Sequence, residues 1–172
     1  MKRPILIISI FFILLAGCHN TQSNSEVVEE SNEEKNISLI EKLLTEADNK
    51  NVDFMDEVCA PDYKYYFPSN SEPINLEEHK AFWKGFNQAF PDLKHSIEDI
   101  YAKDDIVVAR LTVRGTLQNE FAGVPPKGQQ IEAGQILIIR FKNNKIVELR
   151  EEADLLGFYQ QLGMELKLKE NK

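Results

Sequence analysis

The spacing of apolar residues changes once along this chain, and this change limits the folds open to it. Before Pro91 and Asp92 the apolar residues recur at every third or fourth position, as they do on one face of a helix. After these residues the apolar positions alternate with polar ones, as they do in strands. Helices followed by a run of strands predict an α+β fold. A strongly bent antiparallel sheet with helices laid across its hollow face would suit this pattern.

The same spacing predicts where the elements lie. Helices are expected at Ser38–Asn49, Asp53–Cys59, Leu76–Phe90 and Asp154–Leu162. Strands are expected at Tyr63–Phe67, Lys94–Ala102, Asp105–Leu117, Gly128–Lys142 and Lys145–Glu151. Hairpin turns are expected at Lys103-Asp104-Asp105 and Asn143-Asn144-Lys145.

The first residues are typical of an export signal. Two basic residues precede an apolar run from Ile5 to Ala16, which is shorter than the roughly 20 residues of a membrane-spanning helix. The run ends at Leu15-Ala16-Gly17-Cys18, which resembles the lipobox of bacterial lipoproteins. This resemblance implies lipid on Cys18, a membrane partner, and a place in the cell envelope outside the cytoplasm. An ordinary signal peptide that contains a cysteine is the alternative.

Four regions follow from composition. Residues 1–17 are predicted to be the signal peptide, and 18–35 a disordered tether, because that stretch is polar and rich in glutamate. Residues 36–165 have the length and apolar content of one domain, and 166–172 form a polar tail.

Charge and residue spacing exclude some functions. The net charge is −8, and it becomes −10 once Lys2 and Arg3 leave with the signal, which argues against a nucleic-acid partner. The histidines have no metal-binding spacing, so no metal site is predicted. Cys59 would be the one thiol left after lipidation, and it is interpreted as a small buried residue.

Strand alternation brings a few polar residues onto the apolar inner face. Gln135 is the one polar residue among the inner positions of its strand, where it either bonds to backbone or anchors a ligand. Glu151 shares a face with Val147 and Leu149, and burial there would raise its pKa and suit it to acid–base chemistry. The alternative is that the strand ends first and leaves Glu151 in water. Asp154 is either a second acid or the N-cap of the last helix.

Other residues are candidates for the pocket wall. Leu117 continues the inner parity of its strand. Trp83 and Phe86 lie on the apolar side of the third helix, where they form either plain core or a surface for substrate. His95 follows the end of that helix and points either into the pocket or to its edge.

Four segments occur in an order that resembles a known family. They are Ala89-Phe90-Pro91-Asp92-Leu93, the stretch from Gly115-Thr116 through Phe121 to Gly128, Lys145-Ile146-Val147-Glu148, and Asp154-Leu155-Leu156-Gly157 leading to Gly163. Together they resemble the SnoaL-like polyketide cyclases, also called ester cyclases. The resemblance implies the nuclear transport factor 2-like fold, a cone of bent sheet around a pocket. It also implies ring closure by intramolecular aldol condensation, with an acidic residue as acid or base and no cofactor.

Position by position, the resemblance is incomplete. Relatives often read Glu-His-Trp-Asp where this chain has Glu148-Leu149-Arg150-Glu151, so Glu151 keeps an acid while Leu149 replaces a histidine. Leu117 likewise replaces the histidine of a Gly-Thr-His segment. The acid is thus kept without its usual polar neighbours.

Two functions remain open from the sequence. The first is a membrane-anchored lipoprotein whose pocket binds a small apolar or carbonyl-containing molecule, with Gln135 and Glu151 fixing its orientation. The second is a cofactor-independent cyclase or isomerase that uses Glu151 as acid or base. Relatives often pair through the outer face of the sheet, which makes a homodimer a further prediction.

Overall fold

The structure is a computed structural model that describes residues 31–68, 70–165 and 167. The predicted signal peptide, Cys18 and most of the tether lie outside the described residues, as does most of the predicted tail. Within the described part, no helix is long and apolar enough to cross a membrane.

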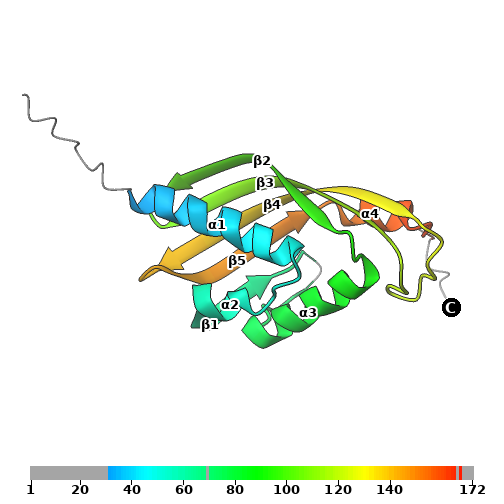
Figure 1. Ribbon diagram of the computed structural model, residues 1–172, viewed down its shortest axis with the longest axis horizontal. Coiled ribbons are helices and arrows are strands. Elements are labelled where there is room, and N and C mark those ends of the chain that lie inside the picture. The colour runs from blue at the N-terminus through cyan, green and yellow to red at the C-terminus, as the bar shows by residue number, and fades with distance from the viewer. Residues whose placement is uncertain (1–30, 69, 166, 168–172) are drawn as a thin grey trace, which may run out of the picture.

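In the described part of the chain, four helices and five strands form the α+β fold that the sequence predicts (Figure 1). The helices are α1 Asn32–Asp48, α2 Phe54–Val58, α3 Leu76–Ala89 and α4 Leu155–Gln161. The strands are β1 Cys59–Tyr66, β2 Lys94–Lys103, β3 Ile106–Thr116, β4 Gln130–Lys142 and β5 Lys145–Ala153. The curled sheet has the order β1-β5-β4-β3-β2, and α1 packs on β2, α3 on β1 and α4 on β4.

Helix α1 begins six residues before the predicted start at Ser38. Ser31 caps the helix by accepting a hydrogen bond from the Glu34 backbone N–H, and the Glu34 side chain accepts one from the Ser31 N–H. This capping box supports a first turn that has little apolar content. Residues 32–35, assigned to the tether from composition, are therefore the first turn of α1.

The sheet is mixed, whereas the sequence predicted an antiparallel one. Strand β1 pairs with β5 in parallel, and Tyr65 lies opposite Leu149. Strand β1 also begins earlier than predicted and runs through Pro61, which an edge strand tolerates because only one side is paired. The other three pairings are antiparallel, as expected.

The inner face follows the predicted alternation except at one bulge. Ile146 alternates with Val147 and Leu149, so the sequence predicts that it faces outward, yet it is fully buried. The β4–β5 register shifts between Arg140 and Phe141, opposite this part of β5, so the parity of Ile146 differs from that of the residues after it. Beyond the shift, Leu149 and Glu151 face inward as predicted.

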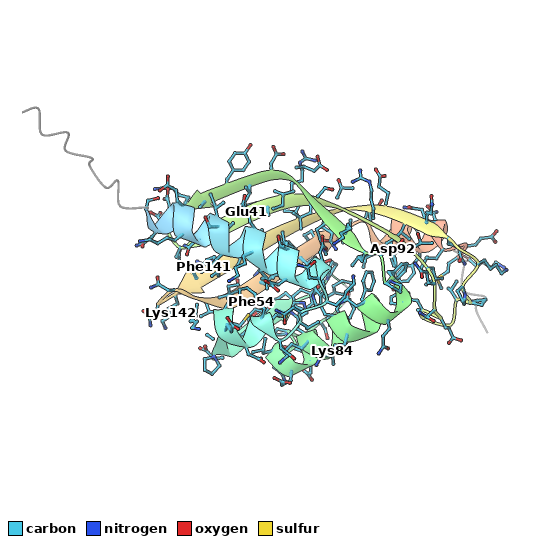
Figure 2. The ribbon with its side chains drawn as sticks, in the orientation of Figure 1. Glu41, Phe54, Lys84, Asp92, Phe141 and Lys142 are labelled. Atoms are coloured by element: carbon cyan, nitrogen blue, oxygen red, sulfur yellow. The ribbon has the colours of Figure 1, made fainter. Side chains whose placement is uncertain are left out.

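Two hydrophobic clusters fill the hollow of the sheet. The larger lies beneath α1 and α2, and it includes Phe54 and Phe141, both labelled in Figure 2. The smaller joins the end of α3 to α4, with Phe90 and Phe158 in contact. Side chains from both clusters line one cavity.

Candidate active site

The cavity between the two clusters has a volume of about 130 Å³ and a mostly apolar wall. Four of its polar side chains come from separate elements: His79 of α3, His95 of β2, Gln135 of β4 and Glu151 of β5. An apolar pocket with a few converging polar groups is the usual form of a small-molecule site.

Glu151 is held by two hydrogen bonds to side chains on its own face of the sheet. Tyr65 Oη donates to Glu151 Oε2 at 2.5 Å, and Gln135 Nε2 donates to Oε1 at 3.0 Å. Both bonds follow from register, since Tyr65 lies opposite Leu149 and Gln135 lies opposite Ala153, each two positions from Glu151. Gln135 thus bonds to a side chain, a partner that neither of the two alternatives from the sequence had named.

Burial raises the pKa of Glu151 above its ordinary value, and the hydrogen bond from Tyr65 offsets part of that rise. Burial and the adjacent Glu151 charge also raise the pKa of Tyr65, so its phenol stays protonated and acts as the donor. The site therefore presents an oriented carboxyl group that is more basic than one in water.

A second network fixes the ring that supports Tyr65. The His79 imidazole stacks on the Tyr65 ring with 3.7 Å between centroids. Trp83 Nε1 donates to His79 Nε2 at 2.8 Å, and His79 Nδ1 lies 2.9 Å from Tyr63 Oη. Because an indole N–H can only donate, Nε2 is the acceptor and Nδ1 carries the proton. Burial lowers the pKa of His79 to about 3, so the ring is neutral.

On β2, at the other edge of the sheet, His95 is bonded to Asp48, the last residue of α1. His95 Nδ1 lies 2.7 Å from Asp48 Oδ1, and the His95 backbone N–H contacts both carboxylate oxygens at 3.2 Å. Burial opposes ionisation of Asp48, but the contacts with His95 hold the pKa of Asp48 below its ordinary value. Asp48 is therefore a charged partner for the ring.

Most of the predicted site residues meet at this cavity. Its wall includes Glu151, Gln135, Trp83, Phe86, Leu149 and His95. Leu117 does not line it, because that side chain is fully buried in the smaller cluster. Asp154 is exposed at the cavity wall and caps α4, its Oδ1 accepting from the Gly157 N–H at 2.9 Å. The N-cap is thus the alternative that the structure supports for Asp154.

Sequence reasoning missed Tyr65, His79 and Asp48. A signal was present for the first two, since Tyr63 and Tyr65 share one face of the predicted strand and His79 precedes Trp83 by one helical turn. No local signal marked Asp48, which is paired with a residue 47 positions later in the chain. Among the described residues, no three His, Cys, Asp or Glu side chains gather as a metal site requires.

The model of the SnoaL-like polyketide cyclase family matches residues 38–162. This chain belongs to that family. The match contains the four segments that carried the resemblance as far as Leu162, and it includes every residue that lines the cavity.

Several solved structures, among them a polyketide cyclase and a protein described as a hydroxylase, share the fold. A SnoaL-like protein from Jannaschia sp. CCS1 is 25% identical with a TM-score of 0.72, over 80% of this chain and 99% of its own. AclR from Streptomyces galilaeus is 26% identical with a TM-score of 0.69, over 75% and 96%. IdmH from Streptomyces antibioticus is 27% identical with a TM-score of 0.68, over 74% and 98%. No curated protein matches the chain.

Proposed function

We propose that this SnoaL-like protein moves a proton beside the carbonyl group of a small, mostly apolar molecule, as a cofactor-independent cyclase or isomerase. One observation carries the proposal: Glu151 lies in an apolar cavity with one hydrogen bond to each carboxyl oxygen. Membership of the cyclase family supports it.

The geometry suits Glu151 to the part of a general base. Its two bonds orient the carboxylate and leave each oxygen a further lone pair for a substrate proton. Its raised pKa brings its basicity closer to that of a base working near neutral pH. Protonated Glu151 would then return the proton to another atom of the substrate. An isomerisation or an aldol closure requires no other chemistry of this residue.

Size and polarity narrow the substrate class. An apolar cavity of about 150 Å³ can hold a benzene molecule, and the cavity here is about 130 Å³. The enclosed part therefore suits a single ring or a short branched carbonyl compound. Aromatic walls from Trp83 and Phe86 would contact its apolar body.

Exchange of α-hydrogens tests the proposal without knowledge of the natural substrate. Cyclohexanone in D₂O is incubated with the protein, and loss of its α-proton signal is followed by NMR. Glu151→Gln should lower the catalysed rate by roughly 10² to 10⁴-fold. Glu152→Gln makes the same chemical change at the next, exposed residue and should leave the rate unchanged. Equal rates for Glu151→Gln and the wild type would rule out the mechanism.

The second candidate function is that of a binding module. It is favoured by the apolar wall of the cavity, in which Leu149 stands where relatives often have a polar histidine. Trp83 is the chain's one tryptophan and lines the cavity, so its fluorescence reports occupancy. Saturable binding of cyclohexanone without any catalysed exchange would favour this module over the enzyme.

We also propose that the protein is exported and held at a membrane in the cell envelope by lipid on Cys18. The support is the basic start, the apolar run and the Leu15-Ala16-Gly17-Cys18 segment. In bacterial cells fed labelled palmitate, the wild type should carry the label in the membrane fraction. Cys18→Ser should lose it, and label that persists in that variant would disprove the anchor.

A further inference from the structure

Asp48 stands where helix electrostatics disfavour a carboxylate. It is the last residue of α1, whose last turn holds no basic residue, and the carbonyl end of a helix carries partial negative charge. Its side chain is only 13% exposed. The compensating contacts come from elsewhere in the chain, above all from His95.

Three contacts fix the His95 ring. Asp48 Oδ1 binds its Nδ1, the His95 backbone is bonded to the same carboxylate, and the Trp83 ring lies against it with 5.4 Å between centroids. The His95 side chain is 4% exposed. With Nδ1 bonded to a carboxylate, the ring has one free nitrogen, Nε2.

That nitrogen is not enclosed by other side chains. Among the described residues, Nε2 has no hydrogen-bond partner. The buried side-chain atoms without a partner in that part of the chain all belong to Asn87, so Nε2 is not one of them. Nε2 is thus not sealed in the core, and His95 lines the cavity. Val113 on β3 lies opposite His95, and Ala133 on β4 lies opposite Val113. Both side chains also line the cavity.

Glu151 lies on the same cavity, three strands away in a sheet that curls around it. A positive charge on His95 lowers the pKa of Glu151, so the two groups act on each other across the space. Lys94 and Lys50 lie near Asp48 and contribute positive charge there. The cavity thus has one carboxylate and one carboxylate-bound imidazole.

We propose that His95 is a second proton-transfer residue of this site and that Asp48 is its positioning residue. The inference rests on the proposed function, because it assigns the partner that Glu151 needs. A base that removes a proton beside a carbonyl leaves negative charge on the carbonyl oxygen, which a donor on the opposite wall stabilises.

The proton balance of the step is complete. The Glu151 carboxylate takes the α-proton, and the C–H electron pair forms a carbon–carbon double bond. The carbonyl π pair moves onto oxygen, which takes the Nε2 proton of the His95 imidazolium. The products are an enol, a neutral imidazole and a protonated Glu151. Reversal of both transfers in D₂O places deuterium on the α-carbon.

The exchange assay with cyclohexanone separates this inference from the proposed function. His95→Gln should lower the rate by roughly 10²-fold or more. Asp48→Asn should lower it by roughly tenfold or more, and Asp48→Glu should restore part of that loss. Asp99→Asn is the control, because it makes the same change on β2 in an ion pair with Arg110 and should keep the wild-type rate.

A structural readout independent of activity accompanies the rates. Nitrogen-15 NMR should show the His95 proton on Nδ1 in the neutral wild type and a different tautomer balance in Asp48→Asn. Loss of exchange in Glu151→Gln with a wild-type rate in His95→Gln would overturn the His95 role and leave the proposed function standing. A wild-type tautomer in Asp48→Asn would overturn the positioning role. Absence of exchange by the wild type would overturn both proposals.

Discussion

Tyr65 Oη donates a hydrogen bond of 2.5 Å to Glu151 Oε2, and this bond joins the first strand to the last. A bond to the ionised form favours that form, so it opposes the effect of burial on the Glu151 pKa. Removing the hydroxyl should therefore raise that pKa further.

This first prediction is tested with Tyr65→Phe and carbon-13 NMR of the glutamate carboxyls. The wild-type Glu151 signal should titrate above the ordinary glutamate value, and the Tyr65→Phe signal higher still. Tyr66→Phe is the control, because that ring lies under Arg150 instead. A Glu151 signal that titrates lower in Tyr65→Phe than in the wild type would contradict the assigned bond.

The second prediction concerns His79 and acid stability. Its folded-state pKa is depressed from 6.5 to about 3, so between these values the unfolded chain binds a proton that the folded chain does not. The stability that this neutral ring contributes is complete above pH 6.5 and is lost as pH falls toward 3. Urea unfolding should show stability falling more steeply with acidity in the wild type than in His79→Gln.

Glu151 affects the pH dependence of stability in the opposite direction. Its pKa is raised in the folded state, so the folded chain takes up this proton first and gains stability as pH falls. This contribution is present in both proteins and cancels in the comparison of slopes. Identical slopes for the wild type and His79→Gln would show that burial does not depress the pKa of His79.

The third prediction uses the cap of α4. A Cβ added at Gly157 would lie 2.2 Å from Asp154 Oδ2, so Gly157→Ala must displace the capping carboxylate. Loss of an N-cap costs about 1 kcal/mol of stability. In an Asp154→Ala background the clash is absent, and Gly157→Ala should instead stabilise by about 0.5 to 1 kcal/mol, because alanine favours a helix over glycine.

Chemical denaturation of the four proteins in this cycle measures the coupling. An equal cost of Gly157→Ala with and without the Asp154 carboxylate would show that the cap is not what the alanine disturbs.

Much of this organisation could be predicted from residues that act locally. The positions of β2 to β5 follow from alternation, and Glu151 and Gln135 were found because each interrupts an apolar face. Tyr65 and Asp48 could not be assigned in the same way, because their roles arise from pairings 86 and 47 residues apart. The register of β1 against β5 and the packing of α1 on β2 set those pairings, and local periodicity encodes neither.

The fourth prediction fills the cavity. Ala153 lines the wall beside Gln135, its neighbour across the strands, so a leucine there should occupy space that a ligand needs. Ala153→Leu should abolish the change in Trp83 fluorescence on addition of cyclohexanone. Ala81→Leu adds the same group on the exposed face of α3 and should bind like the wild type. Unchanged binding in Ala153→Leu would place the ligand elsewhere.

The fifth prediction concerns the outer face of the sheet. Val108 lies opposite both Tyr101 and Ile138, and these side chains are 37%, 68% and 39% exposed. An apolar band of this kind is expected to pair with a second copy of the chain. Sedimentation should show a dimer that Ile138→Lys dissociates, while Leu156→Lys on α4 leaves it intact. A wild type that sediments as a monomer would contradict the prediction.

The parallel pairing of β1 with β5 also determines at which stage of synthesis and folding the site can form. Strand β5 is the last strand of the chain, yet it lies between β1 and β4. During synthesis, the part of the chain that precedes β5 can form its helices and hairpins, but β1 has no partner strand until β5 has been made. Pairing across such a long interval is slow. The hydrogen bond between Tyr65 and Glu151 therefore forms only once β5 has been made, and a chain that stops before Glu151 keeps Tyr65 but has neither the base nor this bond.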